Sequence, residues 1–392
     1  MLGKTGLQIG KWWLLGLAFS ITWLASIPGA RAADYILVPS IQAFAQHNDN
    51  IEFSRQDTLD DNIYTVVPGL KLNYDDMTTK LEADLKAQID RYQQEDDFDN
   101  EFYNAKLDLK HNLTRRFRLN GKFEFTKDTT LESELSETGR IQFREDRYRY
   151  DAGAGVRYSL TELVDLSLNY RYNNVDYKSD TKVDYNRHQA WFSIGKLLKT
   201  QVDRIYVAPR YSLRDSDENR VDSYNLSFGW LHGLSETFKL RIEAGARYTE
   251  NEDKDSNDTD YTWGGVVNFR FFKRTERSEV DLTYTRDLAT TAEGTEVDVD
   301  KIRLYFSWLL TERFKADLDG KFYYTKDEKE DDNIYTRYFE IQPSLLYRMT
   351  EDSALVLEYT YSLEYDEEEA PNERAERNRI WLGVAFNFPY KP

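Results

Sequence analysis

Four histidines are the side chains best suited to acid–base chemistry at neutral pH, and they are widely spread: His47, His111, His188 and His232. A hydrolase would need one of them in a cluster with a serine or an acid. His111 and His232 instead begin two matching segments, HNLT and HGLS, which is typical of a structural repeat. No local spacing indicates catalytic residues, so the sequence predicts that the protein is not an enzyme.

One acidic segment, from Asp253 to Gly264, has oxygen ligands at the first, third and fifth places of a calcium-binding loop. The sixth place is Asp258 instead of glycine, and the twelfth is Gly264 instead of glutamate. The segment is therefore predicted to be a solvated loop, with divalent ions bridging acidic loops to lipopolysaccharide phosphates as the alternative. We expect no metal-binding residues, no cofactor and no cofactor-binding residues.

The elements that carry these residues are expected to be β-strands. From 148 to 159, Tyr148, Tyr150, Ala152, Ala154, Val156 and Tyr158 alternate with arginine, aspartate, glycine and serine. The same period of two occurs in 238–249 and 355–365. Alternation over about ten or more residues indicates strands whose two faces lie in different solvents.

Short breaks and long acidic connections separate these strands in turn. The breaks are centred on a threonine or serine, at Thr78, Thr114, Thr161, Thr200, Ser235, Thr275, Thr311 and Thr350. Acidic connections lie between them, as at 94–101, 250–260, 326–333 and 365–369. Eight short turns join sixteen strands, and further strands at about 36–47 and 376–388 bring the prediction to eighteen, with sixteen as the alternative. An even number of antiparallel strands with short turns at one end predicts a transmembrane up-and-down β-barrel.

The apolar face carries no charged residue near a strand centre, where a charge facing lipid would cost roughly 2–4 kcal/mol. Arg286, Asp298 and Asp300 share the parity of that face and are expected at loop ends. The opposite face is polar and predicts a wet interior. Its candidate pore-lining residues are Arg157, Arg171, Arg204, Arg210, Arg241, Arg247, Glu243, Asp317, Asp319 and Glu340.

Two interpretations of these charges stay open. They could line a water-filled pore and set a transverse field, or they could pair across the barrel and partly close it. The long connection at 127–146 is expected to fold inward as a constriction, with a short helix at Leu131–Glu137. Four aromatic residues with inward parity, Trp191, Tyr206, Tyr305 and Tyr323, could stack against sugars.

The N-terminus predicts export. Lys4 and Lys11 precede an apolar run from Trp12 to Ala25, and a small-residue end follows at Ala30-Arg31-Ala32. This predicts a cleaved signal peptide at 1–32, followed by a barrel domain at 33–392. The 392-residue chain has a charge of −18, no cysteine and a mean hydropathy of −0.73, which a barrel with a hydrated interior explains.

The last strand has a signature of outer-membrane assembly. Gly383, Phe386 and Phe388 resemble the C-terminal pattern recognised by the outer-membrane assembly machinery. Trp381 departs from it at the polar position, and Pro389-Tyr390-Lys391-Pro392 extends beyond the usual terminal aromatic. The assembly machinery is therefore a predicted partner.

The first 40 residues of the mature chain resemble one family. Pro39-Ser40, Asp49-Asn50 and Pro68-Gly69-Leu70 match the opening motif of the putative β-barrel porin 2 group of bacterial outer-membrane proteins. His47-Asn48 replaces the aromatic–acidic pair expected there. The resemblance implies an outer-membrane barrel, and some relatives are linked to exopolysaccharide secretion.

The sequence thus predicts a porin-like barrel in the outer membrane of a Gram-negative-type bacterium, giving passive passage to small hydrophilic solutes. The acidic outer loops favour cations at the entrance. The alternatives are a barrel for exopolysaccharide export and a closed barrel whose acidic loops bind a surface partner. Lipid, lipopolysaccharide and the solute or saccharide are the expected partners, and no nucleic acid is expected.

Overall fold

A computed structural model describes residues 34–327, 335–367 and 374–391 as one closed β-barrel. The predicted signal peptide, 1–32, lies outside the described residues, as do parts of the acidic connections at 326–333 and 365–369. The strands are β1 (Asp34–Asn48), β2 (Asp61–Asp75), β3 (Thr79–Tyr92), β4 (Asn100–Asn112), β5 (Phe117–Thr129), β6 (Asp146–Ser159), β7 (Val164–Tyr177), β8 (Tyr185–Leu197), β9 (Asp203–Ser216), β10 (Asn219–Ser235), β11 (Phe238–Asp253), β12 (Thr259–Arg274), β13 (Ser278–Thr290), β14 (Glu296–Leu309), β15 (Phe314–Asp327), β16 (Tyr335–Arg348), β17 (Ser353–Asp366) and β18 (Arg374–Asn387).

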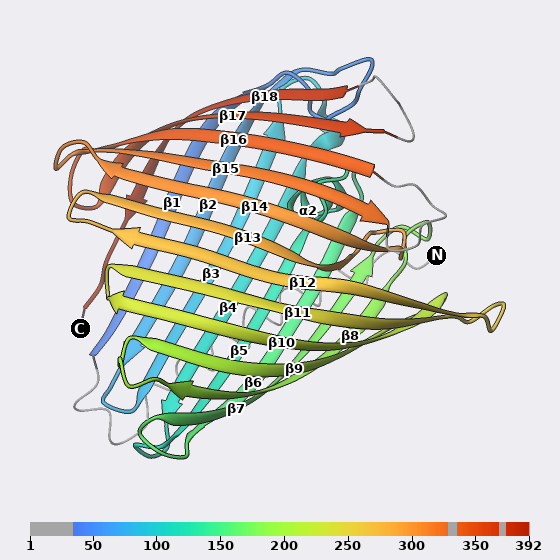
Figure 1. The fold of residues 1–392 in the computed structure, drawn as a ribbon. Coiled ribbons are helices and arrows are strands. Elements are labelled where there is room, and N and C mark those ends of the chain that lie inside the picture. The colour runs from blue at the N-terminus through green and yellow to red at the C-terminus, as the bar shows by residue number, and fades with distance from the viewer. Residues whose placement is uncertain (1–33, 328–334, 368–373, 392) are drawn as a thin grey trace, which may run out of the picture.

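Each strand pairs antiparallel with its neighbours in the chain, and β1 also pairs with β18 (Figure 1). That last pairing runs from Ser40 opposite Asn387 to Asn48 opposite Arg379. It closes the sheet and leaves no strand at an edge, which satisfies the backbone hydrogen bonds without water. The predicted count of eighteen strands is confirmed.

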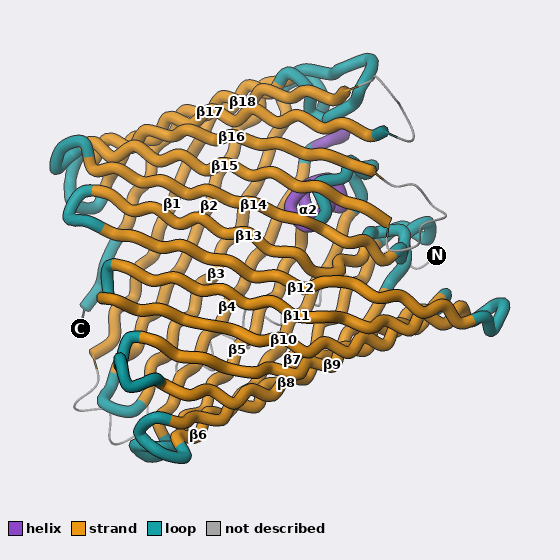
Figure 2. Tube along the Cα trace, viewed as in Figure 1, coloured by secondary structure: helices purple, strands orange, loops and turns teal. Residues whose placement is uncertain are grey.

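The short turns are built on hydroxyl groups, as their threonines predict. At four of them, the hydroxyl accepts a hydrogen bond of 3.0 Å from the backbone N–H three residues later: Thr114 from Phe117, Thr161 from Val164, Thr275 from Ser278, and Thr311 from Phe314. The turn at Thr78 differs, because the carboxylate of Asp76 accepts the bonds instead. These bonds replace ladder partners where the chain reverses. Figure 2 shows the connections gathered at the two ends of the barrel.

The two faces of the wall reverse the burial of a soluble protein. Phe228 and Leu382 lie on the outer face and are 61% and 60% exposed, whereas Arg247 and Arg377 lie inside and are 2% and 1% exposed. An apolar surface around the whole circumference matches a lipid environment. Among the described residues, no helix has the length and apolar character needed to cross a membrane.

The seam between β1 and β18 needs a glycine at Gly383. A Cβ atom there would lie 2.2 Å from the Phe44 ring and 2.5 Å from the Ala43 carbonyl oxygen. Phe44 packs edge-on against Trp381, with ring centroids 6.0 Å apart. The signature glycine of the last strand therefore also has a packing role in barrel closure.

Two short helices interrupt the long connections. The 3-10 helix η1 (Asp96–Phe98) lies between β3 and β4, and helix α2 (Thr130–Glu137) follows β5 directly. The predicted helix at Leu131–Glu137 is confirmed with one residue added at its start. Gly139 ends it with φ +76°, and its N–H bonds the Glu134 carbonyl at 2.9 Å.

Candidate functional site

The candidate site is the inner wall of the barrel, where each of the ten predicted residues makes an ion pair. Their partners lie on the same or nearby strands or on the tip of another hairpin. The pairs are Arg157–Asp165, Arg171–Asp151, Arg204–Asp165, Arg210–Asp287, Arg241–Glu243, Arg247–Asp298, Asp317–Lys315, Asp319–Arg303 and Glu340–Lys321, at 2.5–3.6 Å. The interior is thus organised by paired charges.

Glycine makes room for one of these pairs. Arg204 on β9 reaches Asp165 on β7 at 2.6 Å, across the intervening strand β8. The residue that it crosses is Gly195, where a Cβ atom would lie 2.1 Å from the guanidinium. A side chain at this position would occupy the space of the guanidinium, so Gly195 lets Arg204 reach across β8.

The two signs are unevenly distributed around the wall. Arginines predominate from β6 to β9, at Arg147, Arg149, Arg157, Arg171, Arg187, Arg204, Arg210 and Arg214. Carboxylates gather on the inner faces of β15 to β17, at Asp317, Asp319, Glu340, Glu358, Glu364 and Asp366. Opposed signs on two sides of a lumen with low-dielectric walls create a transverse field.

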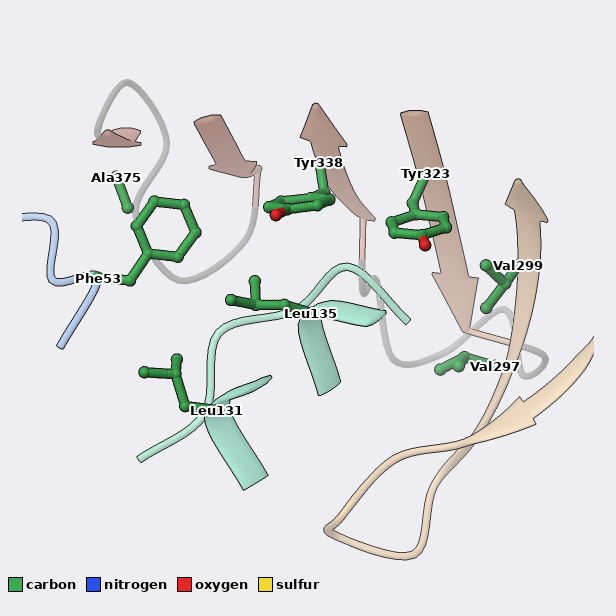
Figure 3. Close-up of a cluster of buried hydrophobic side chains, with 8 residues drawn as sticks. All are labelled: Phe53, Leu131, Leu135, Val297, Val299, Tyr323, Tyr338 and Ala375. Atoms are coloured by element: carbon green, nitrogen blue, oxygen red, sulfur yellow. The ribbon is translucent and has the colours of Figure 1, made fainter. Parts of the chain in front are cut away.

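Helix α2 lies inside the barrel and packs against the inner wall (Figure 3). Leu131 and Leu135, one turn apart, are 1% and 3% exposed and face a cluster from β14, β15, β16 and β18 and from segment 49–60. That cluster contains Phe53, Val297, Val299, Tyr323, Tyr338 and Ala375. The tyrosine rings of Tyr323 and Tyr338 stack at 5.6 Å. The predicted inward fold of 127–146 is confirmed.

Gly139 has a second role, because the chain after α2 passes close to Tyr323 and Tyr338 on the barrel wall. A Cβ atom there would lie 2.8 Å from the Cβ of Tyr338 and 2.9 Å from that of Tyr323. The backbone N–H of Thr130 bonds the Glu145 carbonyl at 2.9 Å and closes the base of the inward segment. The segment is therefore held at its base, at its helix and at the residue that follows the helix.

Polar contacts fix the two ends of α2. Glu132 meets Arg377 at 3.3 Å, and Glu137 meets Arg147 and Arg149 at 3.1 and 2.8 Å. The carbonyl oxygen of Ser136, near the C-terminal end, accepts bonds from Tyr323 Oη at 3.1 Å and Lys301 Nζ at 2.9 Å. Charged donors at unsatisfied carbonyls stabilise a helix end.

The three acids of α2 differ in their protonation. Burial raises the pKa of Glu134 to about 7, and the negative charge of Glu137 adds to this. Burial also acts to raise the pKa of Glu132, but the guanidinium groups of Arg377 and Arg379 outweigh it and lower that pKa to about 2. The carboxyl group of Glu134 accepts a bond of 2.9 Å from the Thr138 hydroxyl, which acts to lower its pKa but does not offset burial.

Two further segments turn inward at the same end of the barrel, and the sequence analysis missed both. In 49–60, Ile51 and Phe53 are fully buried, and Arg55 pairs with Glu364 at 3.0 Å. At the outer end of the β13–β14 hairpin, Ala292 is fully buried and accepts a backbone bond of 3.0 Å from Val183. A signal existed for the hairpin, because Arg286, Asp298 and Asp300 carry charge on the apolar parity of their strands.

A closed barrel with an apolar exterior and a charged interior is the architecture of outer-membrane channel proteins. The sequence model of the family described as putative beta-barrel porin 2 matches residues 27–139. The resemblance predicted from Pro39-Ser40 and Pro68-Gly69-Leu70 is therefore confirmed. The match and the barrel support a location in the outer membrane, as predicted. No curated protein sequence matches the chain.

Several solved outer-membrane proteins are similar to the chain at low sequence identity and with TM-scores below 0.5. OccAB4 of Acinetobacter baumannii is 11% identical, with 92% of this chain and 100% of that chain covered and a TM-score of 0.47. OccK9 (OpdG) of Pseudomonas aeruginosa is 12% identical, with 91% and 98% covered and a TM-score of 0.45. The outer membrane protein opdK of the same organism is 10% identical, with 91% and 99% covered and a TM-score of 0.45. These likenesses concern the fold and carry no information on the solute.

Proposed function

We propose that the protein is an outer-membrane channel that lets small hydrophilic solutes pass by diffusion. One observation carries the proposal: the interior of the closed barrel is lined by charged groups on nearly every strand, while its exterior is apolar. Charges that lose their water cost several kcal/mol each, and pairing on the wall offsets only part of that cost, so such an interior favours a hydrated bore. The inward segments narrow this interior at the end where the long connections lie.

The preference of the channel for one sign of charge follows from two opposed features. The acidic outer connections attract cations to the entrance, whereas the arginines of β6–β9 favour anions further inside. We propose a modest preference for cations at low salt, where the loop charges act over about 10–30 Å. The reversal potential is measured across a planar bilayer in a dilute salt gradient. A sign that indicates selectivity for anions would contradict this preference.

The function is tested by swelling of liposomes that contain the refolded chain. Glucose, sucrose and raffinose in the outer buffer should enter at rates that fall with solute size, because the bore is hydrated and narrowed. Liposomes with heat-unfolded protein are the control and should not swell. Equal rates in both preparations would reject the channel proposal.

Export of an acidic or neutral saccharide is a second candidate, favoured by the inward aromatic residues. Tyr206 lies beside the guanidinium groups of Arg204 and Arg241, at 5.5 and 5.8 Å from its ring centroid. Tyr323 is covered by α2, so a saccharide could stack on it only after the helix moves. For an export channel we expect a low conductance for ions, and we expect added oligosaccharide to interrupt the ionic current. Absence of any conductance would favour the third candidate, a closed barrel with partner-binding loops.

Biogenesis is part of the same proposal. We infer that residues 1–32 are removed as a signal peptide and that Gly383, Phe386 and Phe388 are read by the assembly machinery. Phe386 and Phe388 are 38% and 55% exposed near the end of the last strand, where a partner could contact them. Substituting both with alanine should reduce insertion in cells and leave refolding in detergent unchanged.

A further inference from the structure

The outer end of the β13–β14 hairpin, residues 287–298, leaves the barrel wall; we call it the hairpin tip. Strands β12 and β13 pair through only eight residues, from Val267 opposite Arg286 to Arg274 opposite Glu279. β13 and β14 pair with each other through thirteen residues, as far as Thr290 opposite Glu296. The hairpin therefore stays intact while its tip turns away from β12 and into the lumen.

Four arginines on β8, β9 and β11 hold this tip through its carboxylates. Arg210 meets Asp287 at 2.9 Å, Arg214 meets Glu296 at 2.7 Å, and Arg247 meets Asp298 at 2.7 Å. Arg187 lies 3.8 Å from Glu296. These arginines belong to β8, β9 and β11, so each contact joins strands that are not neighbours in the sheet.

The tip is also held by its backbone. The guanidinium of Arg214 donates a bond of 3.1 Å to the Gly294 carbonyl, and the Asn219 amide donates to the same oxygen at 3.4 Å. Arg187 donates to the hydroxyl of Thr290. The wall thus recognises both carboxylates and neutral oxygens of the tip.

The wall behind the tip has few carboxylates to offer these arginines. The strand between β9 and β11 contributes Val221, Ser223 and Asn225 to the lining, none of them charged. Glu243 on β11 instead accepts bonds from Tyr206 and Ser227, at 2.5 and 2.8 Å. Without the tip, Arg187, Arg210 and Arg214 would lose the carboxylates that pair with them. The arrangement is therefore complementary to a molecule with several carboxylates.

A cavity of about 50 Å³ lies between the tip and these arginines. It has room for a few water molecules, which need roughly 10–15 Å³ each. A sugar acid is far larger, so it can reach the arginines only if the tip moves aside.

We propose that Arg187, Arg210, Arg214 and Arg247 form a binding site for solutes that carry two or more carboxylates, such as acidic saccharides, and that the hairpin tip occupies this site in the resting barrel. The inference rests on the proposed channel function and adds a class of solute to it. Exchange of a tip carboxylate for a solute carboxylate keeps these arginines paired, so the solute and the tip compete for the same guanidinium groups. Solute binding releases the tip and widens the lumen.

Citrate is the probe, with sucrose as the neutral control and chloride at equal ionic strength as the salt control. Binding is measured by calorimetry on the refolded chain, and tip release by hydrogen exchange of backbone amides in 287–298. Citrate should bind and accelerate exchange in the tip, whereas sucrose and chloride should do neither. No acceleration by citrate at saturation, or equal acceleration by chloride, would overturn the inference.

Charge variants separate this site from a merely structural network. Arg210→Gln with Arg214→Gln should weaken citrate binding by about tenfold or more, since charge-assisted bonds are lost. Glu296→Gln weakens the competing tip and should tighten citrate binding. Arg270→Gln, which removes an inner-wall arginine paired with Asp281 outside the site, should leave binding unchanged. Weaker citrate binding in Glu296→Gln would contradict competition.

A covalent lock gives a second test that does not depend on the arginines. The chain has no cysteine, so a disulfide between Val183→Cys and Ala292→Cys would be unique. Their backbone bond of 3.0 Å places the two residues within disulfide range. The locked barrel should lose citrate binding and regain it with reductant. Sucrose entry into liposomes reports on the channel function separately, so failure of either claim can be recognised.

Discussion

Arg377 on β18 and Glu132 on α2 are separated by 245 residues in the chain, yet the Arg377 Nη1 and Glu132 Oε1 atoms lie 3.3 Å apart inside the barrel. The guanidinium of Arg377 is buried and also lies 4.7 Å from the centroid of the Phe53 ring. One arginine thus connects the last strand, the inward helix and the inward segment 49–60. The position of the helix depends on contacts that form only when the barrel closes.

Glu132→Gln should loosen the docking of α2. The substitution leaves a buried guanidinium without its helix partner, at a cost of about 1–3 kcal/mol. Because Arg377→Gln removes the group that needs pairing, the double variant should cost less than the sum of the single ones. Hydrogen exchange of the amides in 130–137 measures this coupling. The exposed pair Arg374–Glu376 is the matched control and should couple by less than about 1 kcal/mol.

Leu135→Ala should release the helix through its apolar face. Leu135 is 3% exposed and packs in the cluster with Tyr323 and Tyr338, so its truncation should cost about 2–5 kcal/mol. The expected result is faster exchange in α2 and larger single-channel conductance, with the barrel itself intact by circular dichroism. Leu309→Ala, at the short-turn end of β14, is the comparison and should leave conductance unchanged. Equal conductance in the wild type and Leu135→Ala would argue that α2 does not narrow the lumen.

Docking of α2 should weaken as pH rises through neutrality. Burial raises the pKa of Glu134 from 4.5 to about 7, so the docked helix binds the proton more strongly than the undocked helix. The stabilisation is present below 4.5 and is lost as pH rises towards the docked pKa. Glu137, Arg147 and Arg140 face this carboxyl and set its charge environment.

The measurement is channel conductance between about pH 5 and pH 8, bracketing this pKa. Conductance should increase with pH in the wild type and should be nearly independent of pH in Glu134→Gln, which stays neutral. Glu276→Gln, in an exposed turn, should keep the wild-type profile. If the conductance of the wild type decreases as pH rises, protonation of Glu134 does not stabilise the docked helix.

Gly383→Ala should impair barrel closure. The added Cβ would meet the Ala43 carbonyl oxygen at 2.5 Å as well as the Phe44 ring, so the backbone of the seam must shift. This shift should lower the stability of the barrel by about 1–3 kcal/mol. The fraction of folded barrel, read from the gel mobility of unheated samples, should fall. Gly265→Ala is the matched control, because a Cβ there meets nothing within 4 Å. Identical folded fractions for the two variants would leave the seam argument without support.

Much of this architecture follows from local patterns in the sequence. Alternation of period two and the threonine-centred turns predict the strands, their number and the direction that each side chain faces. The inward helix was also predictable, since Leu131 and Leu135 are apolar residues one turn apart in an otherwise polar connection. These features depend on residues close together in the chain.

The partners of the inner charges could not be predicted in the same way. The contact of Arg210 with Asp287, or of Arg377 with Glu132, depends on the curvature of the closed wall and on segments that cross the lumen. The inward turn of the β13–β14 tip left a trace in the charged residues Arg286, Asp298 and Asp300, which were expected at loop ends. Their charge on the apolar parity indicates a segment that does not face lipid.

The central claim is a hydrated barrel that helix α2 narrows from within, and single-channel conductance tests it most directly. The refolded chain, residues 33–392, is compared in a planar bilayer with a variant in which 130–143 is replaced by a short Gly-Ser linker. We predict a small conductance for the intact chain and a several-fold larger one for the variant, since removing the helix opens the lumen. Absence of current from both proteins, with both folded and inserted, would contradict the account.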